Sequence, residues 1–528
     1  MITLRPFQLD VRDQAYAQWA MGFRNLLIVI PTGGGKTVVF SDVIAHNAGP
    51  CVAIAHRQEL VAQISMALAR NGVRHKVIGP ASVARQCTTN HLNELRRNYI
   101  DPMSHVAVAG VDTLVRHDPN DPWLRSVTLT VMDEAHHVLA DNKWGTAMGM
   151  FPNARGLGVT ATPVRADGQG LGSHADGLMD TMIVGPGMRE LIQATFLTEY
   201  RIFAPPSDID LTSVPLSASG DFSPPKLAQA VHKSHIVGDV VSHYLRIAPG
   251  KLGVTFAVDV EAAGDIADAY RKAGVSAEVV SAKTPDALRA QILRKFRARE
   301  VLQLVNVDLF GEGFDLPAIE VVSMARPTQS YGLFAQQFGR ALRPLEGKDY
   351  AIIIDHVGNV HRHGLPDAYR VWTLDRRERR AKADTQSIIP TRSCPQCTAA
   401  YERVYTTCPY CGFYAEPASR GAPEFVDGDL AELTVEALAA LRGSIDAPPA
   451  WHPDPIVAAT LAKRNREKAE AQTVLRERMA QWGGERTAAG DTVSMAQRRF
   501  WHKFGVDVAT AQTLNAREAR ELQQRIES

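Results

Sequence analysis

The chain has 528 residues, of which 45% are hydrophobic and 22% are charged, a composition typical of a globular protein too long for one hydrophobic core. Its formal net charge is only +1, so a surface that binds a polyanion has to be built from local patches rather than from a global positive field. No run of about 18 apolar residues occurs, and the first residues lack the pattern of a signal peptide. We therefore expect no membrane contact and a cytoplasmic location.

Two parts of the chain alternate continuous apolar runs with helical patterns. The runs between residues 25 and 165 are NLLIVI, CVAIAH, HVAVAG, LTVMDEAHH and GLGVTATP. Those between residues 250 and 355 are KLGVTFAVDV, SAEVVSA, VLQLVNVDLFGEGFD, IEVVSMARP and YAIIIDHV. Such runs are typical of parallel strands whose sheet is covered by helices on both faces. We therefore predict two α/β domains in tandem, over residues 1–200 and 201–375.

A glycine-rich stretch follows the first predicted strand and precedes a predicted helix. Its residues are Thr32, Gly33, Gly34, Gly35, Lys36 and Thr37. Glycines let backbone N–H groups curl around a phosphate, the lysine reaches the β- and γ-phosphates, and the threonine hydroxyl binds Mg²⁺. The general pattern has a glycine where this chain has Ile30. A glycine-rich turn without a ligand would not explain Lys36, so the stretch predicts a site for ATP and Mg²⁺.

An acidic pair ends the strand predicted in LTVMDEAHH. These two residues are Asp133 and Glu134. One carboxylate of such a pair can hold Mg²⁺ through water, here Asp133, while its neighbour positions the attacking water. The pair could also be a surface feature at the end of a strand, but the phosphate loop upstream favours nucleotide hydrolysis.

Four cysteines form two CxxC pairs separated by ten residues, in CPQC and CPYCG. They are Cys394, Cys397, Cys408 and Cys411. Four thiolates at this spacing can surround Zn²⁺ tetrahedrally, and a site with four protein ligands has no open position for catalysis. The alternative is four reduced thiols without a metal. We predict a structural zinc module over residues 385–415, in which Tyr401, Arg403, Tyr405 and Tyr410 either contact DNA or cover a small core.

The end of the chain has helical character. Residues 416–450 look like a linker, and residues 451–528 are predicted to form a helical module whose last helix begins with a capping box of Asn515 and Glu518. Within the module, the stretch AQRRFWHKFG interleaves cationic and aromatic side chains: Arg498, Arg499, Phe500, Trp501 and Lys503. This mixture suits DNA or a protein partner, and the sequence does not decide between them.

Several motifs in order resemble those of superfamily 2 helicases and translocases over about residues 1–360. They are PTGGGKT, DEAH, the TAT of residues 160–162, and QQFGRALRP, which matches QxxGRxxR. The stretch LRPFQ resembles the adenine-reading segment and implies that Gln8 reads the base. The stretch GEGFDLP resembles the fifth motif and implies that Gly313 and Asp315 help to couple ATP to nucleic acid. The resemblance implies two RecA-like parallel-sheet domains with ATP between them.

The arginines of QQFGRALRP agree with this resemblance on physical grounds. Transfer of a γ-phosphate is accelerated by orders of magnitude when an arginine from another domain stabilises the transition state. Arg340 and Arg343 are three residues apart, so we expect them on one face of a helix in the second domain. The catalytic set that the motifs imply is Lys36, Asp133, Glu134, Gln336, Arg340 and Arg343.

Weaker motifs narrow the resemblance within the superfamily. The RPFQ opening and DEAHH look like the branch of the type III restriction motors and UvrB-like proteins, and IIIDHVGNVHRHG before the four cysteines looks like the bacterial RadD-like helicases and their phage relatives. This implies an ATP-dependent helicase or translocase of a bacterial or phage-infected cell, acting on single-stranded or branched DNA in repair, recombination or replication. The alternatives are a motor subunit of a restriction or defence nuclease and an RNA helicase.

Overall fold

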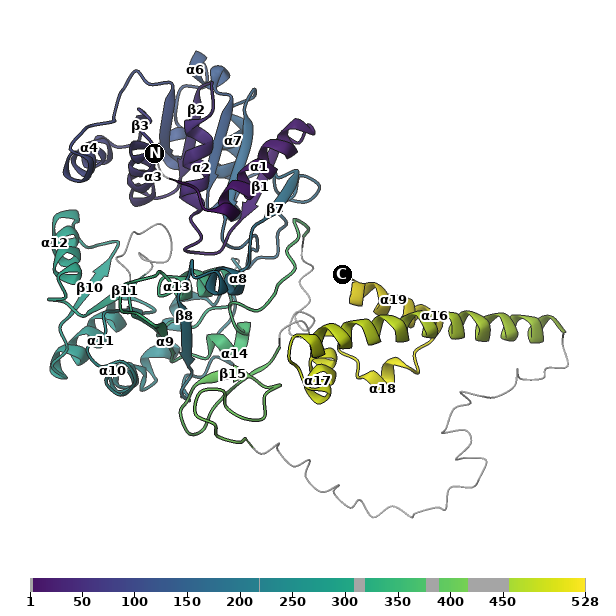
Figure 1. Cartoon of the computed structure of the whole chain (residues 1–528). Helices are drawn as coiled ribbons and strands as arrows, with labels where there is room; N and C mark the ends of the chain where they lie inside the picture. Colours follow the sequence, from purple (N-terminus) through teal and green to yellow (C-terminus); the bar gives the residue numbers. More distant parts are fainter. Residues whose placement is uncertain (1–2, 218, 308–318, 377–388, 416–454, 528) are drawn as a thin grey trace. The chain divides into compact units, whose positions relative to one another are not determined.

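The computed structural model of the chain describes residues 3–217, 219–307, 319–376, 389–415 and 455–527 (Figure 1). Its residue contacts divide the chain into two units. The first consists of Met1–Arg379 with Thr398–Ala400, and the second of Arg380–Cys397 with Tyr401–Ser528. The first unit contains both predicted α/β domains.

The first domain is a parallel sheet of seven strands in the order β3-β4-β2-β5-β6-β1-β7. The strands are β1 (Asn25–Val29), β2 (Cys51–Ala55), β3 (Lys76–Ile78), β4 (Val106–Gly110), β5 (Leu129–Asp133), β6 (Arg155–Thr160) and β7 (Thr181–Val184). The five strands predicted for this domain are confirmed. The sequence analysis missed β3 and β7, because these edge strands are short and partly exposed and so lack a continuous apolar run.

Helices cover both faces of this sheet. They are α1 (Pro6–Ala20), α2 (Lys36–Ala45), α3 (Gln58–Arg70), α4 (Ala81–Leu95), α5 (Val111–Leu114), α6 (Pro122–Ser126) and α7 (Lys143–Gly149). Along β1, Leu26 and Ile28 pack into the core under α1 to α4, whereas Leu27 and Val29 pack into the core on the opposite face. This alternation of side chains explains why β1 reads as a continuous apolar run.

The second domain is a parallel sheet of six strands in the order β10-β11-β9-β12-β13-β8. The strands are β8 (Glu199–Phe203), β9 (Gly253–Phe256), β10 (Ala277–Ser281), β11 (Gln303–Val307), β12 (Val321–Met324) and β13 (Tyr350–Asp355). The helices are α8 (Met188–Gln193), α9 (Pro224–His232), α10 (Ile236–Ile247), α11 (Val260–Lys272), α12 (Asp286–Arg297), α13 (Tyr331–Gly339) and α14 (Asn359–His363). The predicted division at residue 200 falls inside β8, and the core of this domain already includes Met188 and Leu191.

The second unit contains the four cysteines and the predicted helical module. The strands β14 (Thr391–Ser393) and β15 (Ala400–Glu402) form a two-stranded sheet beside the cysteines. Helices α17 (Val493–Phe504) and α19 (Ala516–Glu527) pack against the long helix α16 (Pro455–Ala488), with the short α18 (Val508–Ala511) between them in sequence (Figure 1).

The predicted helical module has a hydrophobic core of its own. Leu475, Phe500, Phe504 and Leu522 are buried together. The capping box is also confirmed, because the Asn515 side chain accepts a hydrogen bond from Glu518 N at 3.0 Å while the Glu518 carboxylate accepts one from Asn515 N at 3.1 Å. Among the described residues, no helix has both the length and the apolar character that a membrane span requires.

Candidate active site

The glycine-rich stretch forms a tight loop between β1 and α2. Gly35 is the N-cap of α2 and has a φ of 86°, in the left-handed region that favours glycine. Space also requires glycine here, since a Cβ atom on Gly34 would lie 2.3 Å from Ile30 Cγ2. The loop therefore places backbone N–H groups and the positive end of α2 where a phosphate can bind, with Lys36 and Thr37 in the first turn. Ile30 takes the place of the usual glycine and is fully buried.

Gln8 lies directly on this loop. Its Nε2 donates a hydrogen bond to Gly34 O at 2.9 Å, and its Oε1 accepts one from Arg5 N at 2.9 Å. A glutamine amide has two N–H groups and two lone pairs, and these bonds use one of each. The same side chain can therefore contact a base edge while it holds the phosphate loop.

The predicted acidic pair ends β5. Glu134 has a φ of 50°, and its N–H donates a hydrogen bond to Asp133 Oδ1 at 3.0 Å. Both side chains are buried. Burial raises the pKa of Asp133 to about 7, the neighbouring charge of Glu134 raises it too, and Lys36 acts in the opposite direction. Carboxylate and threonine oxygens are ligands that Mg²⁺ prefers, so Asp133 and Thr37 fit the predicted cation.

His136 connects the acidic pair to the TAT segment. Its Nδ1 lies 3.0 Å from Thr160 Oγ1 and 3.4 Å from Glu134 Oε2. Thr160 Oγ1 in turn accepts a hydrogen bond from Thr162 N at 3.2 Å. Movement of Glu134 can thus reach the end of β6 through one imidazole and one hydroxyl.

Helix α13 of the second domain lies against three parts of this site. Gln336 Nε2 donates a hydrogen bond to Glu134 Oε2 at 3.4 Å. A Cβ atom on Gly339 would lie 2.6 Å from Thr32 Cβ, and one on Gly332 would lie 2.9 Å from Thr162 Oγ1. The two glycines therefore let α13 approach the phosphate loop and the TAT segment closely.

The prediction that Arg340 and Arg343 share a helical face is wrong. Helix α13 ends at Gly339, Arg340 is its C-cap, and Arg343 lies beyond the helix. Glycine has a low helix propensity, and Pro344 disfavours helical backbone at the residue before it. The two arginines lie on the turn that follows α13, directly after Gly339, which lies against Thr32, and Arg340 is buried.

Lys348 binds the backbone of this turn, a contact that the sequence analysis missed. Its ammonium donates hydrogen bonds to Ala341 O at 2.5 Å, Arg343 O at 2.7 Å and Ile319 O at 3.0 Å. Three N–H groups thus satisfy three carbonyls. Burial lowers the pKa of Lys348 to about 8. No local pattern marks this lysine, because its partners are backbone atoms.

A further contact joins the two domains away from α13. Arg289 Nη1 of α12 lies 2.5 Å from Glu59 Oε1 of α3, and Arg289 Nη2 donates to Thr284 O at 3.0 Å. The two side chains of the ion pair are only 11% and 27% exposed. Glu59 lies in the first turn of α3, and no sequence signal identifies its partner.

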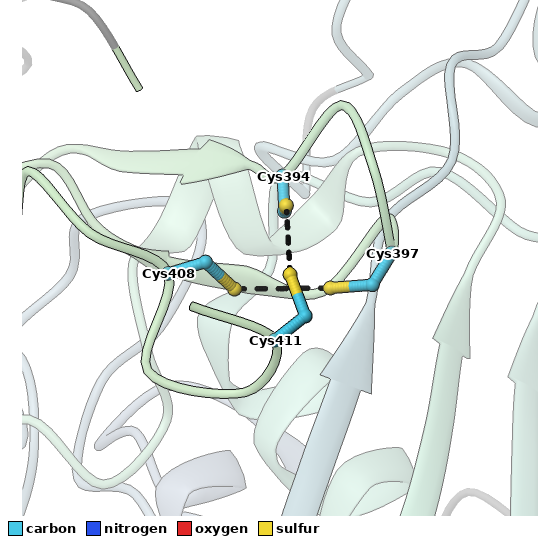
Figure 2. Close-up of side chains that lie close together, drawn as sticks. All are labelled: Cys394, Cys397, Cys408 and Cys411. Carbon is cyan, nitrogen blue, oxygen red and sulfur yellow. Dashed lines mark hydrogen bonds between the residues drawn. The ribbon is translucent and has the colours of Figure 1, made fainter. Parts of the chain in front are cut away.

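The four predicted zinc ligands converge in the second unit (Figure 2). The Sγ atoms of Cys394 and Cys411 are 3.6 Å apart, those of Cys397 and Cys408 are 3.7 Å apart, and all four lie within 4.8 Å of one another. Zn–S bonds of 2.3 Å in a tetrahedron require sulfur atoms about 3.8 Å apart, so the cluster fits Zn²⁺. In the described part of the chain, it is the only group of histidine, cysteine and acidic residues with such an arrangement.

The structure separates the other predicted contact residues. Tyr401 is buried with Cys394 and Cys408, so it covers the small core of the module, whereas Tyr405 and Tyr410 are exposed. Gly313 and Asp315 lie outside the described residues.

Comparisons with known proteins match the same two domains. Residues 1–165 match the family "Type III restriction enzyme, res subunit", and residues 238–344 match "Helicase conserved C-terminal domain". A "51.5 kDa protein" of a Lactococcus phage is 32% identical over 73% of this chain and 77% of its own length. The "Putative ATP-dependent helicase IRC3" of Saccharomyces cerevisiae is 28% identical over 67% of this chain, which spans only 51% of that protein.

Two further comparisons extend this picture. The "Putative DNA 3'-5' helicase Rad25" of Haloarcula marismortui is 25% identical over 65% of this chain and 51% of its own length. A solved fragment of a "putative HsdR subunit of a type I restriction enzyme" from Vibrio vulnificus has the same fold, with a TM-score of 0.50 and 19% identity over 70% of this chain and 67% of that fragment.

Proposed function

Because this chain belongs to the superfamily 2 helicases of the type III restriction-like family, we propose that it couples ATP hydrolysis to movement along single-stranded or branched DNA. The chain is a nucleic-acid-dependent ATPase of the helicase and translocase class. DNA is favoured as the substrate by the name of the Haloarcula relative, a putative DNA helicase, and by the restriction-enzyme family that the first domain matches. Repair, recombination and replication are the processes that such a substrate suggests.

In this proposal the first domain binds the nucleotide. The loop of Thr32, Gly33, Gly34 and Gly35 surrounds the phosphates, Lys36 neutralises them, and Thr37 with Asp133 holds Mg²⁺. Gln8 contacts the adenine while its amide bond to Gly34 keeps the loop in place. The cation would supply charge stabilisation to the phosphates.

Hydrolysis requires residues of both domains. The observation that carries this step is the hydrogen bond from Gln336 to Glu134, because it joins the second domain to the carboxylate that would position the attacking water. Arg340 and Arg343, on the turn after α13, would stabilise the charge that develops on the γ-phosphate. Loss of that phosphate would remove the attraction between the domains, and repeated closing and opening would move the chain along a strand.

The experiment that tests this function measures ATPase rates with single-stranded DNA, duplex DNA, forked DNA and RNA in parallel. We expect stimulation by single-stranded or forked DNA and weaker stimulation by RNA. Lys36→Ala should lose nucleotide binding and turnover, whereas Glu134→Gln should keep binding and lose turnover. Stimulation by RNA alone would contradict the DNA assignment, and normal turnover in either variant would contradict the site.

A second candidate function is the motor subunit of a restriction or defence nuclease. It is favoured by the match of residues 1–165 to the "res subunit" family. In this case DNA would stimulate the ATPase only when a partner subunit is present. The panel of nucleic acids therefore distinguishes the two functions. If the motor acts alone, DNA should stimulate the ATPase rate of the purified chain without any partner.

We also propose that Cys394, Cys397, Cys408 and Cys411 hold a structural Zn²⁺. The support is the fit of the sulfur separations to a tetrahedron and the absence of any disulfide among these cysteines. Four protein ligands leave no position for a substrate, so the metal would stabilise the module and take no part in hydrolysis.

A further inference from the structure

Arg499 connects α17 to the cysteine module within the second unit. Its Nη2 lies 2.8 Å from Glu402 Oε2 and donates a hydrogen bond to the Tyr405 hydroxyl at 3.3 Å. Its Nε lies 3.2 Å from Asp491 Oδ2, and its side chain is only 11% exposed. Arg499 is thus an internal residue, which excludes it as the DNA contact that its place in AQRRFWHKFG suggested.

This arrangement leaves cationic side chains exposed beside the connection. Glu402 and Asp491 are engaged by Arg499, and Asp491 also pairs with Arg486 at 2.9 Å. Arg403 follows Glu402 in the chain and Arg498 precedes Arg499, and both of these arginines are exposed. The ion pair of Glu402 with Arg499 brings β15 and α17 together, and His502 follows Arg498 by one turn of α17. Burial lowers the pKa of His502, and the charges of Arg403 and Arg498 lower it further. The carboxylates of Glu402 and Asp491 are therefore paired within the unit, whereas Arg403 and Arg498 are exposed to solvent.

An aromatic ring is exposed on the same helix. Trp501 is 52% exposed, although the other aromatic residues of α17, Phe500 and Phe504, are buried in the core of the module. The Trp501 ring lies 4.6 Å from that of His502, and Tyr405 of the cysteine module is 37% exposed. Helix α17 thus packs against the core of the module through Phe500 and Phe504. The exposure of Trp501 is not explained by that packing.

We propose that Arg403, Tyr405, Arg498, Trp501 and His502 form a binding face for single-stranded nucleic acid. The arginines would contact phosphates, and Trp501 would stack on an unpaired base, as aromatic side chains do in proteins that bind single strands without sequence preference. Bases in a duplex are already stacked on one another, so a single strand or an unpaired end suits this face better. The inference rests on the proposed function, and it adds a contact outside the ATPase domains.

The test uses the full-length protein and a fluorescein-labelled oligothymidylate. Trp501→Ala should weaken binding about tenfold, because the stacking of a base on one aromatic ring changes affinity by a factor of this order in such proteins. The double variant Arg403→Ala/Arg498→Ala should flatten the slope of log affinity against log salt by about 1.4, since each phosphate contact contributes about 0.7 on a single strand. The ATPase rate without DNA should stay unchanged in both.

Matched controls are available on α19, where Arg517→Ala/Arg520→Ala removes two exposed arginines of the same unit. This control should change neither the affinity nor the salt slope as much as the variants of the face. Retained metal content and helicity would show that the variants are folded. If the wild type binds no nucleic acid, the proposed function fails and this inference fails with it. If the wild type binds and the variants behave like the control, this inference alone is overturned and the face belongs to a protein partner.

Discussion

At the scale of single residues, the turn after α13 carries Arg340 and Arg343, which we propose act on the γ-phosphate. Arg343 is carried by this turn, beyond the helix, and its backbone carbonyl accepts a hydrogen bond from Lys348. A side chain on a turn keeps its direction only if the backbone of the turn is held. The position of Arg343 therefore depends on partners outside its own motif.

We expect Arg343→Ala to lower the rate of ATP hydrolysis by about 10³ or more, because removal of an arginine that stabilises the transferring phosphate has effects of this size. Nucleotide affinity should change by less than about tenfold, or roughly 1.4 kcal/mol. Single-turnover hydrolysis and titration with a fluorescent nucleotide measure the two quantities. Equal losses in both would make Arg343 a ground-state contact.

We expect Lys348→Met to lower kcat while the KM for ATP stays nearly constant, since the variant leaves three carbonyls around the turn without their donor. Lys348→Arg should restore most of the rate, because a guanidinium also offers several donors. Lys272→Met, an exposed lysine of the same domain, is the matched control. A change in KM alone would contradict a role in positioning the turn.

The pH dependence of Lys348 gives a second readout. Its pKa is lowered to about 8 from 10.5, so the unfolded chain binds more protons between these values and this group makes the fold more stable as pH rises. The neutral amine nevertheless has one donor fewer. We expect the rate of the wild type to fall above about pH 8 although stability does not, and Lys348→Arg to keep its rate. The nearby Glu320 is itself paired with Lys251 and Arg299, which limits its influence.

At the scale of elements, the cysteine module has a very small hydrophobic core. Its buried core consists of Cys394, Tyr401 and Cys408, with Cys397 and Phe413 partly buried around them. So small a core cannot offset the conformational entropy of the chain, and a bound metal usually supplies the missing free energy.

We expect about one zinc ion per chain in protein purified without added metal, and none in Cys394→Ser/Cys411→Ser. The double variant should lose the order of the module but keep the ATPase rate without DNA, because the two α/β domains have their own cores. Cys51→Ala, in the first domain, serves as the control and should keep the metal. Elemental analysis decides the point, and stoichiometric zinc in the double variant would refute these ligands.

At the scale of the first unit, two of the contacts between the α/β domains bear on how the domains close. One surrounds α13 at the nucleotide site, and the other is the ion pair of Arg289 with Glu59. Removal of one partner alone would leave a largely buried charge without compensation, so a single substitution should disfavour the closed arrangement.

We expect Arg289→Glu to lower DNA-stimulated ATP hydrolysis several-fold and to reduce domain closure on nucleotide binding, as measured by fluorescence energy transfer between the domains. Arg289→Glu combined with Glu59→Arg should recover part of both. Arg70→Glu is the matched control, because its pair with Glu94 lies within the first domain and is half exposed. No recovery in the double variant would argue against direct coupling through this pair.

Most of the strands and most of the candidate site could be predicted from the sequence, because each of these features is marked by residues that are close together in the chain. Ten strands appear as largely apolar runs, and all of them except the edge strand β10 are buried on both faces of their sheet over most of their length. The phosphate loop, the acidic pair, the cysteine spacing and the capping box of Asn515 each need only a few consecutive positions. For the same reason, the family resemblance of the two domains can be read from short ordered motifs.

Only the tertiary structure decided which distant residues meet. The edge strands β3, β7 and β8 depend on the neighbours that they pair with, and their own side chains give a weak signal. The pair of Arg289 and Glu59 spans 230 positions, and Lys348 binds carbonyls that any residue could provide. Whether a cation is internal, as in Arg499, or exposed, as in Arg498, depends on the elements that pack beside it. Short motifs such as the phosphate loop consist of consecutive residues and can be found in the sequence. The contacts named here form only when distant segments pack together.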